Sequence, residues 1–239
     1  MNKIGIIVAM REEQKAIIDV MEDIKKIQIF NLVFFEGKIQ NKECIIVKSG
    51  IGKVNAARTT QILTDNFELE YIINIGAGGA VNPLLDVGDV LVAKYVVQHD
   101  FDITAFGHSK GFITGVGDKV YCDYKLLEKF QMYMKNAQKR DYNIKIGVVA
   151  TGDIFCTDPA MRDNIIATFD ADVVDMECGA IGQVCYLNQI PFVEIRTISD
   201  SPNGKNASTF DENLEFVSKR CSNILEEFLK WSLWKMQQL

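Results

Sequence analysis

Residues 173–200 read VVDMECGAIGQVCYLNQIPFVEIRTISD, and this stretch decides the fold that the sequence predicts. An apolar run at 173–177 comes first and has the residue types of a buried strand. Apolar side chains at helical spacing follow, until Pro191 breaks the pattern. A second apolar run then leads to Asp200. A strand, a helix and a strand in this order predict an α/β fold with a largely parallel sheet.

Acidic side chains stand near the ends of both apolar runs, at Glu177 and Asp200. Ligands of α/β folds bind at the carboxyl ends of parallel strands, so two acids at the ends of neighbouring strands can serve acid–base chemistry. Asp175 and Glu177 share one face if the strand continues through them, and they diverge if the helix begins there. Arg196 stands four residues before Asp200, a spacing that also suits a structural salt bridge.

The composition suits one domain, residues 1–239, with a substantial core, because 48% of the residues are apolar. A net charge of −6 argues against a nucleic-acid surface and provides no polybasic patch for a membrane. The six cysteines include no C-x-x-C pair, and His99 and His108 are the only histidines that could complete a zinc site. We therefore expect buried free thiols in a reducing compartment, rather than disulfides or a bound metal.

The first apolar run, residues 4–10, could be mistaken for part of a signal peptide. It is very short, it lacks a small-residue cleavage pattern, and it runs directly into Arg11-Glu12-Glu13. A buried strand that leads into a helix explains it better. No stretch approaches the roughly 18 apolar residues of a membrane-spanning helix. We expect a cytoplasmic protein.

Alternating and helical patterns along the rest of the chain predict further elements, with residues 100–120 and 201–208 as loops. The expected strands are 4–10, 28–39, 43–48, 71–75, 87–98 and 144–150. The expected helices are 11–26, 53–66, 123–140, one that opens at Asp158-Pro159, and 210–234. Asp as N-cap and Pro at the first helical position are typical of a helix start.

Three local features leave two explanations open. The run Gly76-Ala77-Gly78-Gly79 follows a strand but lacks the third glycine of a dinucleotide site, which leaves a tight turn or a close approach to a ligand. Glu12 and Glu13 belong either to a solvated first turn or, one of them, to a cleft. Phe155 and Phe210 either fill the core or stack on a planar base.

Several motifs together resemble the nucleoside phosphorylase/nucleosidase superfamily, and within it the bacterial methylthioadenosine/S-adenosylhomocysteine nucleosidases. The similarity runs from Gly5 to about Phe228. The matching segments are 5–13 (GIIVAMREE), 49–54 (SGIGKV), 99–100 (HD), 104–106 (TAF), 151–155 (TGDIF), 176–177 (ME), 196–200 (RTISD) and 210–212 (FDE). The resemblance implies a single-domain α/β fold with a central mixed, twisted sheet flanked by helices.

The resemblance also implies roles for individual residues around the reacting bond. Asp200 would protonate the purine at N7, and Ser199 would orient it. Glu13 would activate the attacking water. Glu177 would bind the ribose hydroxyls, with Met176 packed under the sugar. A carboxylic acid must stay protonated near neutral pH to donate, which burial or a nearby negative charge favours.

The remaining implied contacts surround the base and the 5′ substituent. Phe155 would stack on adenine, and the backbone of Cys156 would bind the edge of the base. Gly79 would let the backbone approach the ligand. The other expected contacts are with the alkylthio group, from Met10, Ile51 and Phe210, and from Phe106 of the second subunit of a homodimer. The family resemblance implies no cofactor and no metal, and the expected substrates are methylthioadenosine, S-adenosylhomocysteine and 5′-deoxyadenosine.

Two other functions remain open at this point. A purine nucleoside phosphorylase would need arginines for phosphate, yet no Arg follows residues 76–79 before Lys94, and the carboxylate of Glu13 would repel phosphate. The other is a non-catalytic nucleoside- or glycan-binding protein on the same scaffold, which would not need Glu13, Glu177 and Asp200 together. Ala77, Cys156 and Asp175 depart from the commoner residues of the family, which bears on the preference among substrates more than on the reaction.

Overall fold

The computed structural model describes residues 2–136, 140–200 and 206–236. The strands are β1 (Lys3–Val8), β2 (Glu22–Ile29), β3 (Leu32–Ile39), β4 (Lys42–Lys48), β5 (Leu69–Ala80), β6 (Val90–Gln98), β7 (Val120–Tyr121), β8 (Ile144–Thr151), β9 (Val173–Asp175) and β10 (Phe192–Asp200). The helices are α1 (Arg11–Ile18), α2 (Lys53–Asn66), the short 3-10 helix η1 (Thr104–Phe106), α3 (Tyr124–Asn136), α4 (Pro159–Phe169), α5 (Cys178–Leu187) and α6 (Asn206–Met236).

A ten-stranded mixed sheet runs through the described part of the chain. Strand β5 is its centre, because it pairs in parallel with β1 and β10 and antiparallel with β9. Strands β6 and β8 connect β10 to β9, which closes β5, β10, β6, β8 and β9 into a ring. Strands β4, β3 and β2 extend the sheet beyond β1. The α/β fold with a mixed central sheet that the resemblance implied is confirmed.

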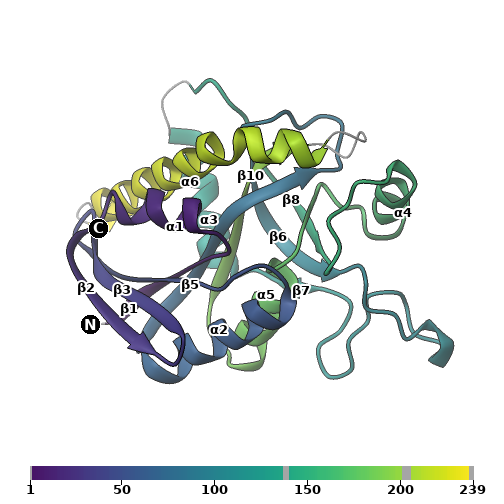
Figure 1. The fold of residues 1–239 in the computed structure, drawn as a ribbon, viewed down its shortest axis with the longest axis horizontal. Coiled ribbons are helices and arrows are strands. Elements are labelled where there is room, and N and C mark those ends of the chain that lie inside the picture. The colour runs from purple at the N-terminus through teal and green to yellow at the C-terminus, as the bar shows by residue number, and fades with distance from the viewer. Residues whose placement is uncertain (1, 137–139, 201–205, 237–239) are drawn as a thin grey trace.

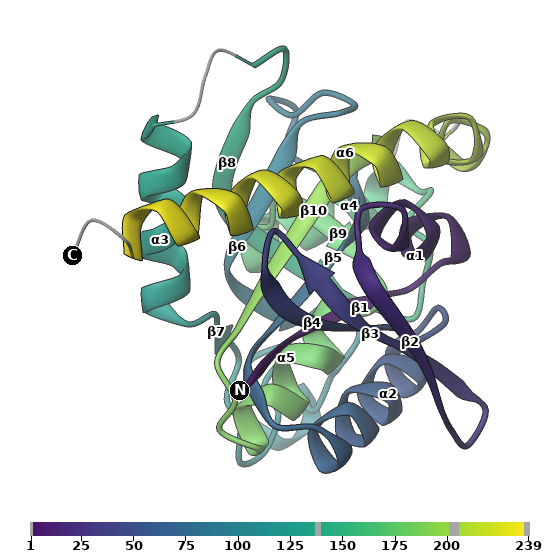
Figure 2. The ribbon, with the colours of Figure 1, turned by 90° about the vertical axis from the view of Figure 1, so that its left-hand side faces the viewer.

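Helices bury both faces of this sheet, which explains the unbroken apolar runs in the sequence. Helices α1 and α6 cover one face, and α2 and α5 cover the other (Figure 1). Figure 2 shows α6 lying across the sheet, with α3 beside its C-terminal part. Along β1, Ile6 and Val8 pack toward α1 and α6, whereas Ile7 packs toward α2 and α5. None of the helices in the described ranges is long and apolar enough to cross a membrane.

Some predicted elements are confirmed almost residue by residue. Helix α2 spans the predicted 53–66. The side chain of Asp158 caps α4 by accepting a hydrogen bond from the backbone N–H of Ala160 at 3.0 Å, and proline opens the helix. In both places the residues that determine the helix lie within a few positions of one another, so the helix can be predicted without knowing its tertiary partners.

Other element boundaries were predicted wrongly. The helix predicted over 11–26 ends at Ile18, and β2 begins at Glu22 because it pairs with β3. The strand predicted over 28–39 is interrupted by a turn in which Phe30 has φ 54°. Helix α6 starts at Asn206 rather than at residue 210, and the rest of the loop predicted there, 201–205, lies outside the described residues.

The two strands that carry the acids are not neighbours, contrary to expectation. Strand β9 ends at Asp175, and both β9 and β10 pair with β5, which lies between them. Gly79 of β5 has Asp200 as its register partner on one side and Val174 on the other. The acids therefore approach the end of β5 from both of its edges.

Candidate active site

A cavity of about 750 Å³, counting the space open to solvent, lies at the C-terminal half of β5. Its lining combines apolar side chains with a few polar groups, as small-molecule sites do. The predicted site residues that line it are Met10, Glu13, Ile51, Gly79, Phe155, Cys156, Met176, Glu177, Ser199, Asp200 and Phe210. Three of the acids that the sequence singled out, Glu13, Glu177 and Asp200, thus share one hollow.

Glu13 is buried in the first turn of α1, with an exposed fraction of 1%. Its carboxylate accepts hydrogen bonds from the backbone N–H groups of Ala9, Met10 and Ala77, each at 2.9 Å. Burial raises the pKa of Glu13, and the amides that bind it only partly offset this effect. A solvated first turn is therefore ruled out for Glu13, whereas Glu12 is exposed.

The glycine run is part of a strand, not a turn, because β5 continues to Ala80. A Cβ atom at Gly76 would lie 2.6 Å from Glu13 Oε1, and one at Gly78 would lie 2.6 Å from a methyl group of Val173. Real Cβ atoms do not approach so closely, so these positions lack side chains because neighbouring side chains occupy the space. The sequence left open a tight turn or a close approach to a ligand; the tight turn is wrong, and at Gly76 and Gly78 the close neighbours are side chains of this chain.

Asp200 ends β10 with an exposed fraction of 2%. The Ser199 hydroxyl donates a hydrogen bond to Asp200 Oδ1 at 2.7 Å. A Cβ atom at Gly79 would stand 3.3 Å from Asp200 Oδ2, so the carboxyl lies directly against the backbone of β5. Gly76, which faces Glu13, precedes Gly79 by three residues, which is about 10 Å of strand. The two acids thus lie against different positions of β5, and both line the cavity.

Glu177 immediately precedes α5 and reaches back to the loop before α2. Its Oε1 accepts a hydrogen bond from the backbone N–H of Gly52 at 2.9 Å. Burial, reinforced by the negative charge of Asp175, raises the pKa of Glu177 to about 8. Strand β9 ends at Asp175 and α5 begins at Cys178, and the two acids have different partners, Gly52 for Glu177 and Arg196 for Asp175.

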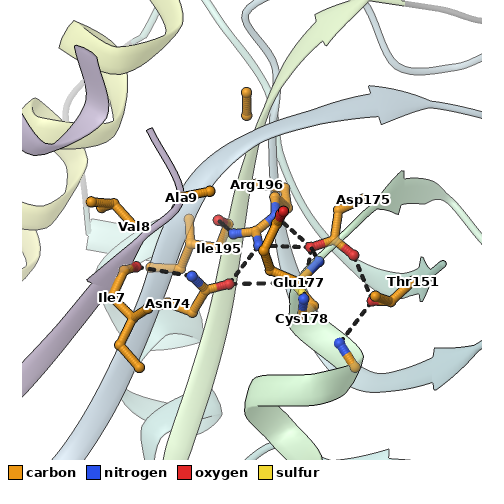
Figure 3. Close-up of polar contacts among 12 residues, drawn as sticks. Ile7, Val8, Ala9, Asn74, Thr151, Asp175, Glu177, Cys178, Ile195 and Arg196 are labelled. Carbon is orange, nitrogen blue, oxygen red and sulfur yellow. Dashed lines mark hydrogen bonds and ion pairs between the residues drawn. The ribbon is translucent and has the colours of Figure 1, made fainter. Parts of the chain in front are cut away.

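Arg196 pairs with Asp175 rather than with Asp200, which corrects the salt bridge considered from the sequence. Its Nη2 lies 2.8 Å from Asp175 Oδ2, and both side chains are 2% exposed. Figure 3 shows the guanidinium between Asn74 and Asp175, with Thr151 on the far side of Asp175. Burial opposes ionisation of Asp175, but the charge of Arg196 and the hydrogen bonds from Thr151, the Cys178 amide and Arg196 together lower the pKa of Asp175.

Apolar side chains complete the walls of the cavity. The rings of Phe155 and Phe210 meet edge to face, with centroids 5.8 Å apart. Phe155 is 40% exposed, which leaves much of its ring free for a flat ligand. Ile51 is 54% exposed at the same cavity, and Cys156 is buried. A planar base and an apolar substituent would both find matching surfaces here.

Phe106 is the one predicted site residue that does not line the cavity. It lies in η1 and is 81% exposed. Contact with a second molecule would remove this apolar ring from water, which is favourable in free energy. Within a single chain, Phe106 takes no part in the site.

Sequence reasoning missed Asn74 and Thr151, which hold the Arg196–Asp175 pair. The side chain of Asn74 donates to Ile7 O at 2.9 Å and accepts from Arg196 Nη2. The Thr151 hydroxyl donates to Asp175 Oδ1 and accepts from the backbone N–H of Gly179 at 2.7 Å. Polar residues inside apolar strands were the available signal, because buried polar groups need partners.

The comparisons with known proteins agree with this geometry. A family model described as the phosphorylase superfamily matches residues 3–230. The 5'-methylthioadenosine/S-adenosylhomocysteine nucleosidase of Staphylococcus haemolyticus is 39% identical over 228 residues, which are 95% of this chain and 99% of that protein.

Solved structures show the same likeness. The 5'-methylthioadenosine/S-adenosylhomocysteine nucleosidase from S. pneumoniae, solved with the transition-state inhibitor MT-ImmA, has a TM-score of 0.90 and 33% identity, over 95% of this chain and 98% of that one. The S-adenosylhomocysteine nucleosidase from Streptococcus pyogenes, in complex with 5-methylthiotubericidin, has a TM-score of 0.91 and 36% identity, over 96% of each chain. With such relatives along nearly its whole length, the chain belongs to the phosphorylase superfamily and, within it, to the family of 5'-methylthioadenosine/S-adenosylhomocysteine nucleosidases.

Proposed function

We propose that this protein hydrolyses the N-glycosidic bond of 5'-methylthioadenosine and S-adenosylhomocysteine and releases adenine. The convergence of Glu13, Glu177 and Asp200 in one partly apolar cavity carries the proposal. The names of the relatives support the same substrates. 5′-Deoxyadenosine, which shares the adenine and the ribose, is a third expected substrate.

Asp200 is the general acid of the proposed reaction. Adenine is a poor leaving group until its ring accepts a proton, and a buried carboxylic acid at the end of β10 can donate one to N7. The hydrogen bond from Ser199 holds one carboxyl oxygen and so orients the group at the end of β10. The Phe155 ring holds the base by stacking.

Glu13 is the proposed base for water. Its raised pKa brings the carboxylate closer to the value at which a general base works best near neutral pH. The bonds from three backbone amides fix its orientation and place it against β5, about 10 Å of strand from the position of Asp200. An acid and a base on opposite sides of a sugar, with water between, parallel the arrangement in inverting glycosidases.

Glu177 is proposed to bind the ribose hydroxyls, with Met176 beneath the sugar. The amide of Gly52 holds one of its carboxyl oxygens, which leaves the other for the substrate. Met10, Ile51 and Phe210 offer apolar contacts to the 5′ substituent.

The shortage of basic side chains among the described residues of the cavity favours hydrolysis over phosphorolysis. Among the described residues that line it, Arg196 is the only Lys or Arg. Its guanidinium already donates to Asp175, Asn74 and the carbonyl of Ile195. A phosphate ion would thus meet the carboxylate of Glu13 without a free cation among the described lining residues to hold it, whereas water would not be repelled.

Further parts of the proposal concern the assembly and the compartment. We propose a homodimer in which the exposed Phe106 of each subunit contacts the alkylthio pocket of the other. All six cysteines are buried free thiols, which supports work in the reducing cytoplasm. The whole chain, residues 1–239, would act as one nucleosidase domain.

The test is the release of adenine from 5'-methylthioadenosine in phosphate-free buffer and in buffer with phosphate. We expect equal rates and a free reducing sugar as the second product. A rate that depends on phosphate, with a sugar 1-phosphate as product, would identify a phosphorylase. Tight binding of the nucleoside without any release of adenine would identify a binding protein.

A further inference from the structure

A half-buried ion pair lies outside the lining of the cavity. Lys53 Nζ stands 2.6 Å from Asp100 Oδ1, and the two side chains are 18% and 17% exposed. The other oxygen of Asp100 accepts a hydrogen bond from the backbone N–H of Asp153 at 2.9 Å. The side chain of Asp153 in turn accepts from the backbone N–H of Lys53 at 2.8 Å. We call these three residues, Lys53, Asp100 and Asp153, the Lys53 clamp.

The clamp joins three segments that are far apart in the sequence. Lys53 opens α2, Asp100 follows β6, and Asp153 follows β8. Gln98 also accepts a hydrogen bond from Lys53 Nζ at 3.2 Å. Burial opposes ionisation of Asp100, but the hydrogen bonds from Lys53 and from the Asp153 amide outweigh it and lower the pKa of Asp100. These bonds therefore favour the ionised form of Asp100.

Each end of the clamp continues directly into a segment that faces the cavity. Gly52, next to Lys53, donates its backbone N–H to Glu177. Phe155 and Cys156, two and three residues beyond Asp153, line the cavity. At Gly52, where φ is 97°, a Cβ atom would lie 3.1 Å from Asp153 Oδ1. The two segments thus touch, and the clamp fixes their distance from each other.

No other side-chain bond recorded for the described residues ties the 152–156 segment to α2. The backbone N–H of Gly152 donates to the carbonyl of Asp175 at 3.1 Å, which fixes only the start of the segment. At Asp153, the segment is bonded both to Asp100 and to the Lys53 amide. The clamp is thus a direct link between the Gly52 amide on one side and the start of the Phe155 segment on the other.

We propose that Lys53 and Asp100 are positioning residues for the nucleoside, which act by holding Gly52 on Glu177 and Phe155 beside the base. This inference rests on the proposed function, because it assigns the ribose to Glu177 and the purine to Phe155. It adds two residues that touch neither the substrate nor the cavity. Their effect on the substrate runs through the backbone of Gly52 and of residues 153–156.

The expected kinetic signature differs from that of a lost acid or base. The ribose contact and the base contact act on bound substrate and on the transition state alike, so their loss raises KM and leaves kcat almost unchanged. Loss of one charged hydrogen bond corresponds to about a tenfold rise in KM. Damage to Glu13 or Asp200 would instead lower kcat.

The experiment compares Lys53→Met and Asp100→Ala with the wild type, using 5'-methylthioadenosine as substrate. We expect KM to rise about tenfold in each variant, with kcat within about twofold. Because the two residues act as one unit, the double variant should be no worse than the more affected single variant. Lys53→Arg, which keeps the charge, should recover most of the affinity.

Lys145→Met is the matched control. Lys145 Nζ also stands 2.6 Å from an aspartate, Asp172, but this pair lies away from the cavity. Loss of this second Lys–Asp pair should leave KM unchanged. If Lys145→Met raises KM as much as Lys53→Met does, or if neither variant of the clamp changes KM, the clamp has no positioning role.

Hydrogen exchange of the backbone amides provides a readout that does not depend on activity. In Lys53→Met and in Asp100→Ala, the amides of residues 152–156 and of Gly52 should exchange faster than in the wild type, whereas those of α3 should not change. Unchanged exchange at residues 152–156 would overturn the proposal. Should the wild type release no adenine, the proposed function fails, but the exchange comparison still judges the clamp.

Discussion

Replacement of Glu177 by glutamine should stabilise the folded protein, by an amount that grows with pH. Glutamine has the size of glutamate and keeps the oxygen that accepts the 2.9 Å bond from Gly52. It cannot ionise, however, so it avoids the cost of a negative charge in a buried position beside Asp175. The substitution therefore separates the charge of Glu177 from its shape.

The magnitude follows from the pKa of Glu177, which the fold raises from 4.5 to about 8. Between these values the folded protein holds a proton that the unfolded chain has released, so the stability of the wild type falls as pH rises. This cost is less than about 1 kcal/mol at pH 5 and about 3 kcal/mol at pH 7. The variant should thus gain roughly 2–3 kcal/mol on the wild type over this range, or about 5–10 °C in Tm.

Urea unfolding of both proteins at pH 5, 6, 7 and 8 measures the effect. The difference in unfolding free energy, variant minus wild type, should increase at each step. Glu12→Gln is the matched control, because Glu12 is exposed and its replacement should give a difference that does not change with pH. If the difference for Glu177→Gln is constant, or if it decreases with pH, the environment described for Glu177 is wrong.

Three further outcomes are expected. Glu13→Gln should abolish hydrolysis while adenine still binds, measured by turnover and by calorimetry; a retained rate would mean that another group activates the water. Asp175→Ala should lower the unfolding free energy in urea by about 3–5 kcal/mol, because it leaves the charge of Arg196 buried without its counter-ion; a loss below about 1 kcal/mol would show that the charge finds another partner. Phe106→Ala should weaken substrate binding in an intact dimer, and an unchanged dissociation constant would count against a shared pocket.

Local signals in the sequence predicted those parts of the fold that depend on neighbouring residues. The cap at Asp158 and the helix over 53–66 are examples, since helix starts and helical spacing are set within one or two turns. The helix predicted over 11–26 failed because Val20, Met21 and Ile24 also fit that spacing. Pairing with β3, the next strand of a hairpin, makes residues 22–29 a strand, so tertiary pairing overrides the helical spacing of these residues.

The glycine run at 76–79 shows why the sequence alone could not decide between a tight turn and a close approach. A turn and a close approach need the same residue, because both need the absence of a side chain. The choice depends on Glu13, which comes more than sixty residues earlier in the chain and fills the space beside Gly76. The contact between them appears only in the folded chain.

Most residues of the site could be predicted from the sequence only because several motifs were taken together. Strand ends carrying acids suggested Glu177 and Asp200, but spacing alone paired Arg196 with the wrong aspartate. The fold places Asp175 on β9 and Arg196 on β10, with β5 between the two strands, and brings their side chains to 2.8 Å across it. The Lys53 clamp was not predicted either, since its three residues belong to three separate loops and helix starts.

The most direct test of the central claim is the turnover of Asp200→Asn on 5'-methylthioadenosine, with adenine binding measured on the same sample. Asparagine has the shape of aspartate but cannot donate the proton that the departing purine needs. We expect turnover to fall more than about a hundredfold, the scale of general-acid catalysis, while the dissociation constant for adenine changes little. Turnover close to that of the wild type would contradict the assignment of Asp200 as the acid, and with it the account of how this cavity breaks the bond.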